Sequence, residues 1–257
     1  MAPRPSDSPH LSVIIPAYNE AERLLPYLTS IITYLRGRDH SYEVLVVDDG
    51  STDGTAALVE KVGTENPAVQ LLRLPRNRGK GHAVRAGMQQ ARGRLRLMAD
   101  ADGATPIVEL ERLEAVLREG ADLAIGSRLL ASRDPRYTVK ARWHRSELGN
   151  LFNWTVRRLG IREIADTQCG FKLFSQAVAE DLFSVACIDG YGFDLELLYI
   201  AQRRGYKIAE VPINWADQPG SKVWVLKDGF CMLREMLAVR RNYAHGLYAR
   251  KDARSPE

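Results

Sequence analysis

The sequence predicts an α/β fold in which a mostly parallel sheet is flanked by helices, with an amphipathic helix at the C-terminus. Three observations support this fold class: short apolar segments alternate with amphipathic ones, most apolar segments end in a turn rich in Gly, Asp or Asn, and 45% of the 257 residues are hydrophobic. Such alternation is typical of βαβ units, whose parallel strands are covered on both faces. A chain of this length can bury one large core, so we expect one main domain.

Short apolar runs bounded by turn formers predict the strands. They span Leu11 to Ile15, Glu43 to Val47, Val69 to Leu74, Leu95 to Ala99, Leu123 to Ile125 and Lys207 to Trp215. Apolar residues at helical spacing predict the helices. These span Leu24 to Leu35, Thr55 to Val62, His82 to Ala91, Ile107 to Leu117, Val178 to Phe183, Phe193 to Arg203 and Lys227 to Arg241. Between them, Ser132 to Arg145 is polar and predicted to be a loop.

The pattern divides the chain into three parts. Residues 1–10 are rich in proline and serine and are expected to be flexible, residues 11–225 hold the α/β domain, and residues 226–257 form a basic amphipathic helix and tail. The first ten residues lack the apolar segment of a secretory signal, and no stretch approaches the roughly 20 apolar residues that span a bilayer. We therefore expect any membrane contact to be peripheral, unless a partner supplies an anchor.

Charge and cysteine usage exclude several classes of function. The net charge is +4, but acidic residues are dispersed among the basic ones and aromatic residues do not interleave with them, so we expect no nucleic-acid binding. Anionic small molecules or lipid head groups fit this charge better. The three cysteines, Cys169, Cys187 and Cys231, contain no Cys-x-x-Cys pair, which argues against a disulfide framework or a zinc site. A reducing compartment is expected.

Two carboxylates, Asp100 and Asp102, directly follow the predicted strand Leu95 to Ala99. The carboxyl end of a strand is where open α/β sheets bind ligands. Carboxylates that flank a single residue repel each other, but they can share a hard divalent cation whose other positions are filled by phosphate oxygens and water. The pair suggests a nucleoside-diphosphate site, although acidic pairs also occur in turns and caps.

Four polar segments each close or follow a predicted strand. In order they are VIIPAYNE (13–20), VVDDGSTDG (46–54), NRGKG (77–81) and DADGATP (100–106). Together they resemble the nucleotide-sugar half of the family 2 glycosyltransferases, which have a GT-A fold with a Rossmann-like, mostly parallel sheet. Segment 77–81 matches neither a P-loop nor a dinucleotide-binding fingerprint, which disfavours an NTPase or a dehydrogenase.

The second half of the chain narrows the resemblance. Residues 166–174 (DTQCGFKLF), 193–201 (FDLELLYIA) and 220–222 (GSK) are similar to dolichyl-phosphate β-glucosyltransferases. The related mannosyltransferases usually follow the second aspartate with leucine, then serine or glutamine, then histidine, where this chain has Gly103, Ala104 and Thr105. This departure favours glucose over mannose. Eukaryotic members usually begin with a membrane helix, which this sequence does not contain.

The resemblance implies a metal-dependent, inverting transfer of glucose from UDP-glucose to dolichyl or another polyprenyl phosphate, giving a β-linked lipid phosphosugar. Three alternatives remain at this point. The same fold can use GDP-mannose or another UDP-sugar, or a non-lipid acceptor, and a nucleotide-sugar-binding subunit without turnover is a different class. The acidic and basic residues that the family's motifs require are all present, which argues against a binding subunit without turnover.

The resemblance also assigns residues to the donor site. Asp102 is the expected direct ligand of Mg²⁺ or Mn²⁺, and Asp100 a contact to the ribose or to the metal and its water. The full set of expected nucleotide-sugar contacts is Pro16, Ala17, Tyr18, Glu20, Asp49, Lys80, Asp100, Ala101 and Asp102. Within it, Pro16 and Tyr18 would shape the uracil pocket. Asp48 ranks below Asp49 because a carboxylate at the start of a turn often bonds to the turn's own backbone.

A polyprenyl phosphate is already anionic near neutral pH, because its second pKa is about 6, so its transfer needs no strong general base. The site needs cations instead, and the planar guanidinium of arginine binds phosphate well. The expected acceptor and diphosphate contacts, by resemblance, are Arg128, Arg145, Ser146 and Lys222, with Lys172 as a weaker candidate. Asp102 and Arg128 are thus expected to be catalytic residues.

Asp194 is the third catalytic candidate, through a competing mechanism in which Asp194 or Glu196 deprotonates a sugar hydroxyl. Their spacing places them on different faces of a helix, so we expect at most one to point inward and the other to lie on the surface. Asp166 is expected to order the acceptor loop, and Cys169 to contribute only packing.

Two segments, Leu148 to Leu159 and Lys227 to Tyr243, combine bulky apolar residues with arginines. This pattern is typical of helices that lie in a membrane interface, and equally of helices packed on a domain. Basic residues at the C-terminus would favour an anionic leaflet, namely Arg240, Arg241, Arg250, Lys251 and Arg254. The expected location is cytoplasmic and peripheral, at the inner face of the membrane.

Overall fold

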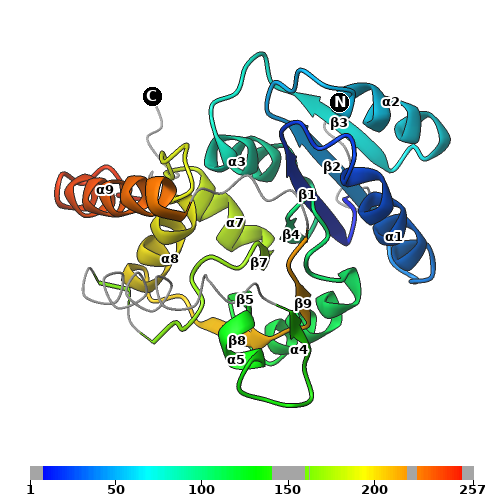
Figure 1. Ribbon diagram of the computed structural model, residues 1–257. Coiled ribbons are helices and arrows are strands. Elements are labelled where there is room, and N and C mark those ends of the chain that lie inside the picture. The colour runs from blue at the N-terminus through cyan, green and yellow to red at the C-terminus, as the bar shows by residue number, and fades with distance from the viewer. Residues whose placement is uncertain (1–7, 141–159, 162, 219–224, 251–257) are drawn as a thin grey trace, which may run out of the picture.

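Helices cover both faces of a central sheet in the computed structural model, which describes residues 8–140, 160–161, 163–218 and 225–250 (Figure 1). Some sequence predictions lie outside these residues: the contacts at Arg145, Ser146 and Lys222, the segment Leu148 to Leu159, and the basic residues Lys251 and Arg254.

The main sheet has seven strands in the order β3-β2-β1-β4-β7-β5-β8 within the described residues. Their bounds are β1 Leu11–Ala17, β2 Tyr42–Asp48, β3 Val69–Arg73, β4 Leu95–Ala99, β5 Leu123–Ser127, β7 Phe171–Ser175 and β8 Ile208–Pro212. Strand β7 runs antiparallel to its neighbours β4 and β5, and the other pairs are parallel. The predicted mostly parallel sheet is confirmed.

Strand β7 is absent from the sequence prediction, although its residues belong to the motif 166–174. Lys172 interrupts an otherwise apolar run, and a charge at that place argues against a strand buried on both faces. The lysine is fully buried all the same, because its ammonium group has a carboxylate partner within the fold. The prediction failed at a residue whose partner is distant in sequence.

The helices divide between the two faces of the sheet. On one face lie α1 (Leu24–Arg36), α2 (Thr55–Glu65) and α4 (Leu110–Arg118), and on the other α3 (Lys80–Gln90), α7 (Gln176–Phe183) and α8 (Phe193–Arg203). Alternate residues of β1 serve the two cores, since Ile14 packs with the α3 side while Val13 and Ile15 pack with the α1 side. This period of two is what a strand buried on both faces requires.

Several boundaries differ from the prediction. Helix α3 begins at Lys80 rather than His82, so Gly79 is its N-cap and Lys80 lies in its first turn. The predicted strand Lys207 to Trp215 is two strands, because β8 ends at Pro212, and β9 (Trp215–Ala216) pairs in a separate small sheet with β6 (Val139–Lys140). Part of the predicted loop Ser132 to Arg145 is therefore strand. The short helix α5 (Arg128–Ala131) and the 3₁₀ turn η2 (Ile107–Glu109) precede it along the chain.

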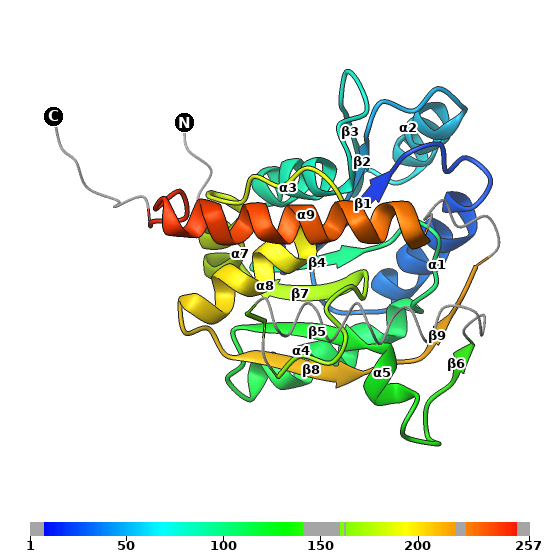
Figure 2. The same cartoon turned by 60° about the vertical axis from the view of Figure 1, so that its left-hand side comes forward.

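Helix α9 (Val225–Ala244) is the predicted amphipathic C-terminal helix, and it crosses the α3 and α8 side of the domain (Figure 2). Met236 and Val239 are fully buried and belong to the core on that side. One face of α9 is thus packed on the domain, as one of the two sequence interpretations expected. None of the helices in the described residues has the length and apolar character needed to cross a bilayer.

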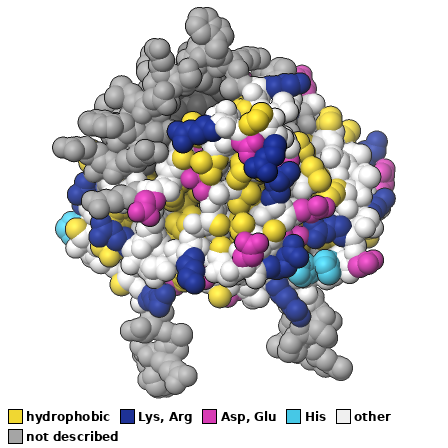
Figure 3. All heavy atoms as spheres, turned by 90° about the horizontal axis from the view of Figure 1, so that it is seen from below, with side chains coloured by type: hydrophobic (Ala, Val, Ile, Leu, Met, Phe, Trp, Pro, Cys, Tyr) yellow, Lys and Arg dark blue, Asp and Glu magenta, His cyan; other side chains and the backbone are white. Residues whose placement is uncertain are grey.

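The carboxyl ends of β1, β2 and β4 meet at one edge, because these strands are neighbours in the sheet and run parallel. The polar segments that follow them are thereby brought together from three separate parts of the sequence. The face seen in Figure 3 shows basic and acidic side chains interspersed around apolar ones, without a continuous patch of one sign on its described surface.

Candidate active site

Asp100 follows β4 and forms an ion pair with Lys80 of α3, with 2.6 Å between Oδ1 and Nζ. Burial lowers the pKa of Lys80, but the carboxylates of Asp100 and Asp194 outweigh this effect and raise it above its ordinary value. The other side of Asp100 is closed by Gly170, where a Cβ would lie 2.0 Å from Oδ2. Asp100 is therefore held between the start of α3 and the backbone before β7.

Asp102 has fewer contacts than Asp100 in the described residues. Its carboxylate accepts a hydrogen bond from the Ala104 amide at 3.0 Å. Burial, and next the charge of Asp100, raise the pKa of Asp102 above its ordinary value. A divalent cation would relieve that repulsion, and two carboxylates are the hard oxygen ligands that Mg²⁺ and Mn²⁺ accept. Across the described part of the chain no group of three or more His, Cys, Asp or Glu is placed to hold a metal, so phosphate oxygens and water would complete the coordination.

The two aspartates after β2 have separate structural roles. Asp48 accepts a hydrogen bond from the Ser51 amide at 2.9 Å, which confirms that it can hold its own turn. Asp49 accepts backbone hydrogen bonds from Arg78 at 3.1 Å and Gly79 at 2.8 Å, so it fixes the loop that leads into α3. Burial raises the pKa of Asp49, and these two amides oppose the shift. Asp49 orders the loop whether or not it also contacts a base.

The expected donor contacts from Pro16 to Glu20 lie at the end of β1 and in the segment that follows it. Pro16 and Ala17 are buried within β1, whereas Tyr18, the next residue, is 38% exposed. Glu20 forms a bidentate pair with Arg23, with distances of 2.6 and 2.8 Å. Sequence reasoning did not single out Arg23, whose charge also acts on Asp100 and Asp102; its position three residues after Glu20 was the available signal.

Arg128 and Asp166 form a bidentate ion pair. Nε and Nη2 of Arg128 each lie 2.7 Å from a carboxylate oxygen, and the Arg128 amide donates to the same carboxylate at 2.9 Å. Although burial opposes it, this pairing raises the pKa of Arg128. The guanidinium also lies over the ring of Trp215, 5.4 Å from its centroid. Asp166 thus orders Arg128 from the loop before β7.

Lys172 and Asp194 form a buried ion pair of 2.5 Å, and the ammonium also donates to the Cys169 carbonyl at 2.6 Å. Lys172 is completely buried, so it is a poor candidate for contact with an acceptor phosphate. Burial raises the pKa of Asp194, and the charge of Lys172 opposes this. The charge of Lys80 also lowers the pKa of Asp194, and that of Asp100 raises it, so the pair is coupled electrostatically to the strand-end site.

The expectation that only one of Asp194 and Glu196 would point inward is wrong. Glu196 is fully buried too, and it accepts hydrogen bonds from the amides of Cys187 at 2.9 Å and Ile188 at 3.0 Å and from the Tyr248 hydroxyl at 2.6 Å. The two side chains do lie on different faces of α8, but packing covers both faces. Cys169 is buried, as its packing role requires.

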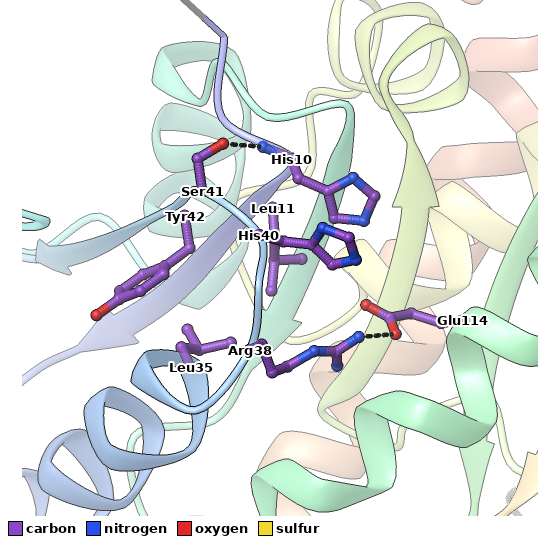
Figure 4. A pocket seen from close by; sticks show the side chains of 8 residues that line it. All are labelled: His10, Leu11, Leu35, Arg38, His40, Ser41, Tyr42 and Glu114. Carbon is purple, nitrogen blue, oxygen red and sulfur yellow. Dashed lines mark hydrogen bonds and ion pairs between the residues drawn. The ribbon is translucent and has the colours of Figure 1, made fainter.

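A small pocket lies at the opposite, amino-terminal end of β1 (Figure 4). His10 and His40 stack there with ring centroids 4.4 Å apart, and Arg38 forms a 2.6 Å ion pair with Glu114. The volume is about 10 Å³, enough for one water molecule. This ion pair joins the segment after α1 to α4, at the end of the sheet opposite to Asp100 and Asp102.

The part of the chain that builds the strand-end site matches a known protein family. A protein-family model described as glycosyl transferase family 2 matches residues 12–183. The chain belongs to glycosyl transferase family 2. It is a glycosyltransferase, and the expected GT-A fold is confirmed by its structural neighbours.

Curated relatives of this glycosyltransferase cover nearly the whole chain. It is 39% identical over 255 residues to a dolichyl-phosphate β-glucosyltransferase of Dictyostelium discoideum, covering 95% of this chain and 78% of that protein. It is 36% identical over 257 residues to the Saccharomyces cerevisiae protein of that name, covering 93% and 76%. The similarity to this subgroup is confirmed.

Solved structures share the fold at lower sequence identity. Mannosyl-3-phosphoglycerate synthase from Rubrobacter xylanophilus aligns with a TM-score of 0.67 at 19% identity, covering 96% of this chain and 78% of that one. Glucosyl-3-phosphoglycerate synthase from Mycobacterium tuberculosis, solved with Mn²⁺, UDP-glucose and phosphoglyceric acid, aligns with a TM-score of 0.65 at 20% identity, covering 96% and 82%.

Proposed function

We propose that this glycosyltransferase transfers glucose from UDP-glucose to dolichyl phosphate or a related polyprenyl phosphate, with inversion, giving a β-linked lipid phosphosugar. The observation that carries the proposal is the pair Asp100 and Asp102 at the end of β4, held beside Lys80 in a chain 36–39% identical to dolichyl-phosphate β-glucosyltransferases. A nucleoside diphosphate bound there would meet two carboxylates and one ammonium group.

Asp102 and Asp100 would hold Mg²⁺ or Mn²⁺ together with the donor's diphosphate. A bound divalent ion supplies Lewis-acid charge to a leaving diphosphate. The structural relative solved with Mn²⁺ and UDP-glucose supports this choice of metal and donor. Lys80 would remain near the diphosphate because α3 begins at that residue, and Asp49 would keep the preceding loop closed over the site.

Arg128 is the described residue best suited to bind the acceptor phosphate. Asp166 holds its Nε and Nη2, and its Nη1 has no hydrogen-bond partner in the described residues. The phosphate is already ionised, so holding it near the anomeric carbon is the main requirement. The expected contributions of Arg145, Ser146 and Lys222 stay predictions.

A phosphate acceptor also agrees with the state of Asp194 better than a sugar hydroxyl does. A general base must be able to reach the hydroxyl and accept its proton. Asp194 is buried, and the Lys172 ammonium holds its carboxylate at 2.5 Å, so it is not placed to reach a hydroxyl group of an acceptor. We therefore assign Asp194 to the support of the site rather than to proton transfer.

The outer face of α9 and the residues after it would dock on an anionic membrane surface. Leu237, Tyr243 and Leu247 are exposed by 57%, 40% and 61%. Basic residues exposed on the same part of the chain are Arg234, Arg240, Arg241 and Arg250. A hollow of about 550 Å³ lies along α9. Its lining includes Leu237 and Arg241, so apolar and basic side chains are neighbours on this surface. This arrangement suits an interfacial helix whose other face is packed.

Membrane docking predicts sedimentation with liposomes that contain anionic lipid at low salt, and release at high salt. Replacing Arg240 and Arg241 together by glutamine should reduce the bound fraction several-fold, because each basic residue near the surface contributes about 1 kcal/mol. Replacement of Arg36, which is exposed on α1, is the matched control. Equal recovery in the supernatant with and without liposomes would contradict membrane docking.

The proposed activity predicts transfer of labelled glucose into lipid that is extracted by organic solvent. Purified protein, a polyprenyl phosphate and Mg²⁺ or Mn²⁺ would be incubated with UDP-glucose, UDP-GlcNAc or GDP-mannose in parallel. We expect product from UDP-glucose and loss of product with EDTA. Product from another donor would replace the sugar and keep the mechanism. Binding of a nucleotide sugar without lipid product would contradict the proposed acceptor.

A further inference from the structure

Glu235 of α9 contacts the backbone at the start of α8. Its Oε2 accepts a hydrogen bond from the Gly192 amide at 2.7 Å, and Gly192 is the N-cap of α8. A Cβ at Gly190 would lie 2.1 Å from Oε1 of Glu235, and one at Gly192 would lie 2.6 Å from Oε2. The carboxylate therefore lies directly on the glycine backbone of the loop 187–192.

Tyr248, just after α9, holds the beginning of the same loop through Glu196. The Tyr248 hydroxyl donates to Glu196 at 2.6 Å, and Glu196 accepts the amides of Cys187 and Ile188. Both Tyr248 and Glu196 are buried. The C-terminal part of the chain thus contacts both ends of loop 187–192.

The other side of this loop packs against the start of α3. The His82 amide donates to the Asp189 carbonyl at 3.2 Å. A Cβ at Gly79 would lie 2.5 Å from that same carbonyl oxygen, and one at Gly81 would lie 2.4 Å from the carbonyl oxygen of Ile188. Backbone therefore meets backbone on both sides of Lys80, and a shift of the loop must move the first turn of α3.

Charged side chains strengthen this contact. The Asp189 carboxylate pairs with Arg78 at 2.9 Å and with Arg85 at 2.5 Å, one on each side of Lys80 in the sequence. Lys80 in turn reaches Asp100 at 2.6 Å. A continuous series of contacts runs from α9 through loop 187–192 to the strand-end carboxylates.

We propose that Glu235 is a positioning residue for the donor site: by holding loop 187–192 against Gly79 and Gly81, it keeps Lys80 on Asp100. The packing of α9 against the domain then affects the affinity of the donor site for the nucleoside diphosphate. This inference rests on the proposed function in one respect, that Lys80 and Asp100 bind the donor. Glu235, on the C-terminal helix, therefore supports the donor site rather than the acceptor site.

The test compares Glu235→Ala with Glu235→Gln, which keeps an oxygen acceptor for the Gly192 amide. Glu60→Ala, an exposed glutamate of α2, is the matched control. UDP binding in the presence of MnCl₂ would be measured by calorimetry, and amide hydrogen exchange would be followed over residues 79–83 and 187–193. We expect Glu235→Ala to weaken UDP binding about tenfold and to speed exchange in both segments. Glu235→Gln should restore most of the affinity, and Glu60→Ala should match the wild type.

Gly81→Ala tests the same contact from the α3 side, since its Cβ would displace the Ile188 carbonyl. This variant should weaken UDP binding although Glu235 is intact. If Glu235→Ala does not fold, Gly81→Ala tests whether the contact between loop 187–192 and α3 supports UDP binding. Unchanged UDP affinity in folded Glu235→Ala, or faster exchange that stops at α8 and leaves residues 79–83 protected, would overturn the proposal. If the wild type binds no UDP, the proposed function fails, and the exchange comparison alone still decides whether α9 is coupled to α3.

Discussion

Replacing Asp102 by asparagine is expected to lower the rate of glucosyl transfer by roughly 10²–10³-fold, because a Lewis-acid metal contributes several kcal/mol to the transition state. Asp102 is a site carboxylate with little to hold it besides the Ala104 amide, and burial beside Asp100 leaves it with a raised pKa. Both features fit a ligand whose cation arrives with the substrate. The measurement is the initial rate of labelled lipid product at saturating Mn²⁺.

Two comparisons make the Asp102 prediction specific. Asp39→Asn removes an exposed carboxylate remote from the site and should leave the rate unchanged. Asp100→Asn should cost less than Asp102→Asn, because Asp100 is already neutralised by Lys80. Thermal unfolding of each variant separates loss of activity from loss of fold. A rate within threefold of the wild type for Asp102→Asn would rule out a ligand role for this residue.

Replacing Lys172 by methionine is expected to lower the free energy of unfolding by about 3–5 kcal/mol. The substitution keeps an unbranched side chain one heavy atom shorter but leaves the Asp194 carboxylate buried without its 2.5 Å partner. The Cys169 carbonyl loses its donor as well. Urea denaturation followed by circular dichroism would measure the change.

The double variant Lys172→Met with Asp194→Asn should recover much of that stability, since replacing both charges of a buried pair removes the unpaired one. It also tests the catalytic candidate Asp194. If Asp194 only supports the site, the folded double variant should transfer glucose within about tenfold of the wild type. A general base contributes roughly 10²–10⁴-fold, so a larger loss in a stable double variant would assign Asp194 to proton transfer.

Much of the strand-end site could be predicted from local sequence. The strands that end at Ala17, Asp48 and Ala99 are short apolar runs closed by turn residues, and β4 has the predicted bounds. The side-chain period that packs β1 into two cores depends on strand geometry alone. For the same reason the local pattern is sufficient to place Asp100 and Asp102 at the end of a strand.

The error at Glu196 shows what local reasoning lacks. Helical spacing correctly separates the faces of Asp194 and Glu196, but it does not reveal how many faces of a helix are covered. Helix α8 is buried along most of its length because the sheet lies on one side and α9 with Tyr248 on another. Burial depends on neighbours that come from far along the chain.

The sequence by itself determined the class of sheet, the strand ends and the carboxylates there, because these follow from local periodicity and turn chemistry. Only the tertiary structure decided that β7 can bury a lysine, that Asp166 holds Arg128, and that Glu235 reaches the loop beside Lys80. Each of these depends on a partner between 22 and 43 residues away in the chain. A buried charge or capped backbone is stable only when its partner is in place, and that partner becomes known once the chain has folded.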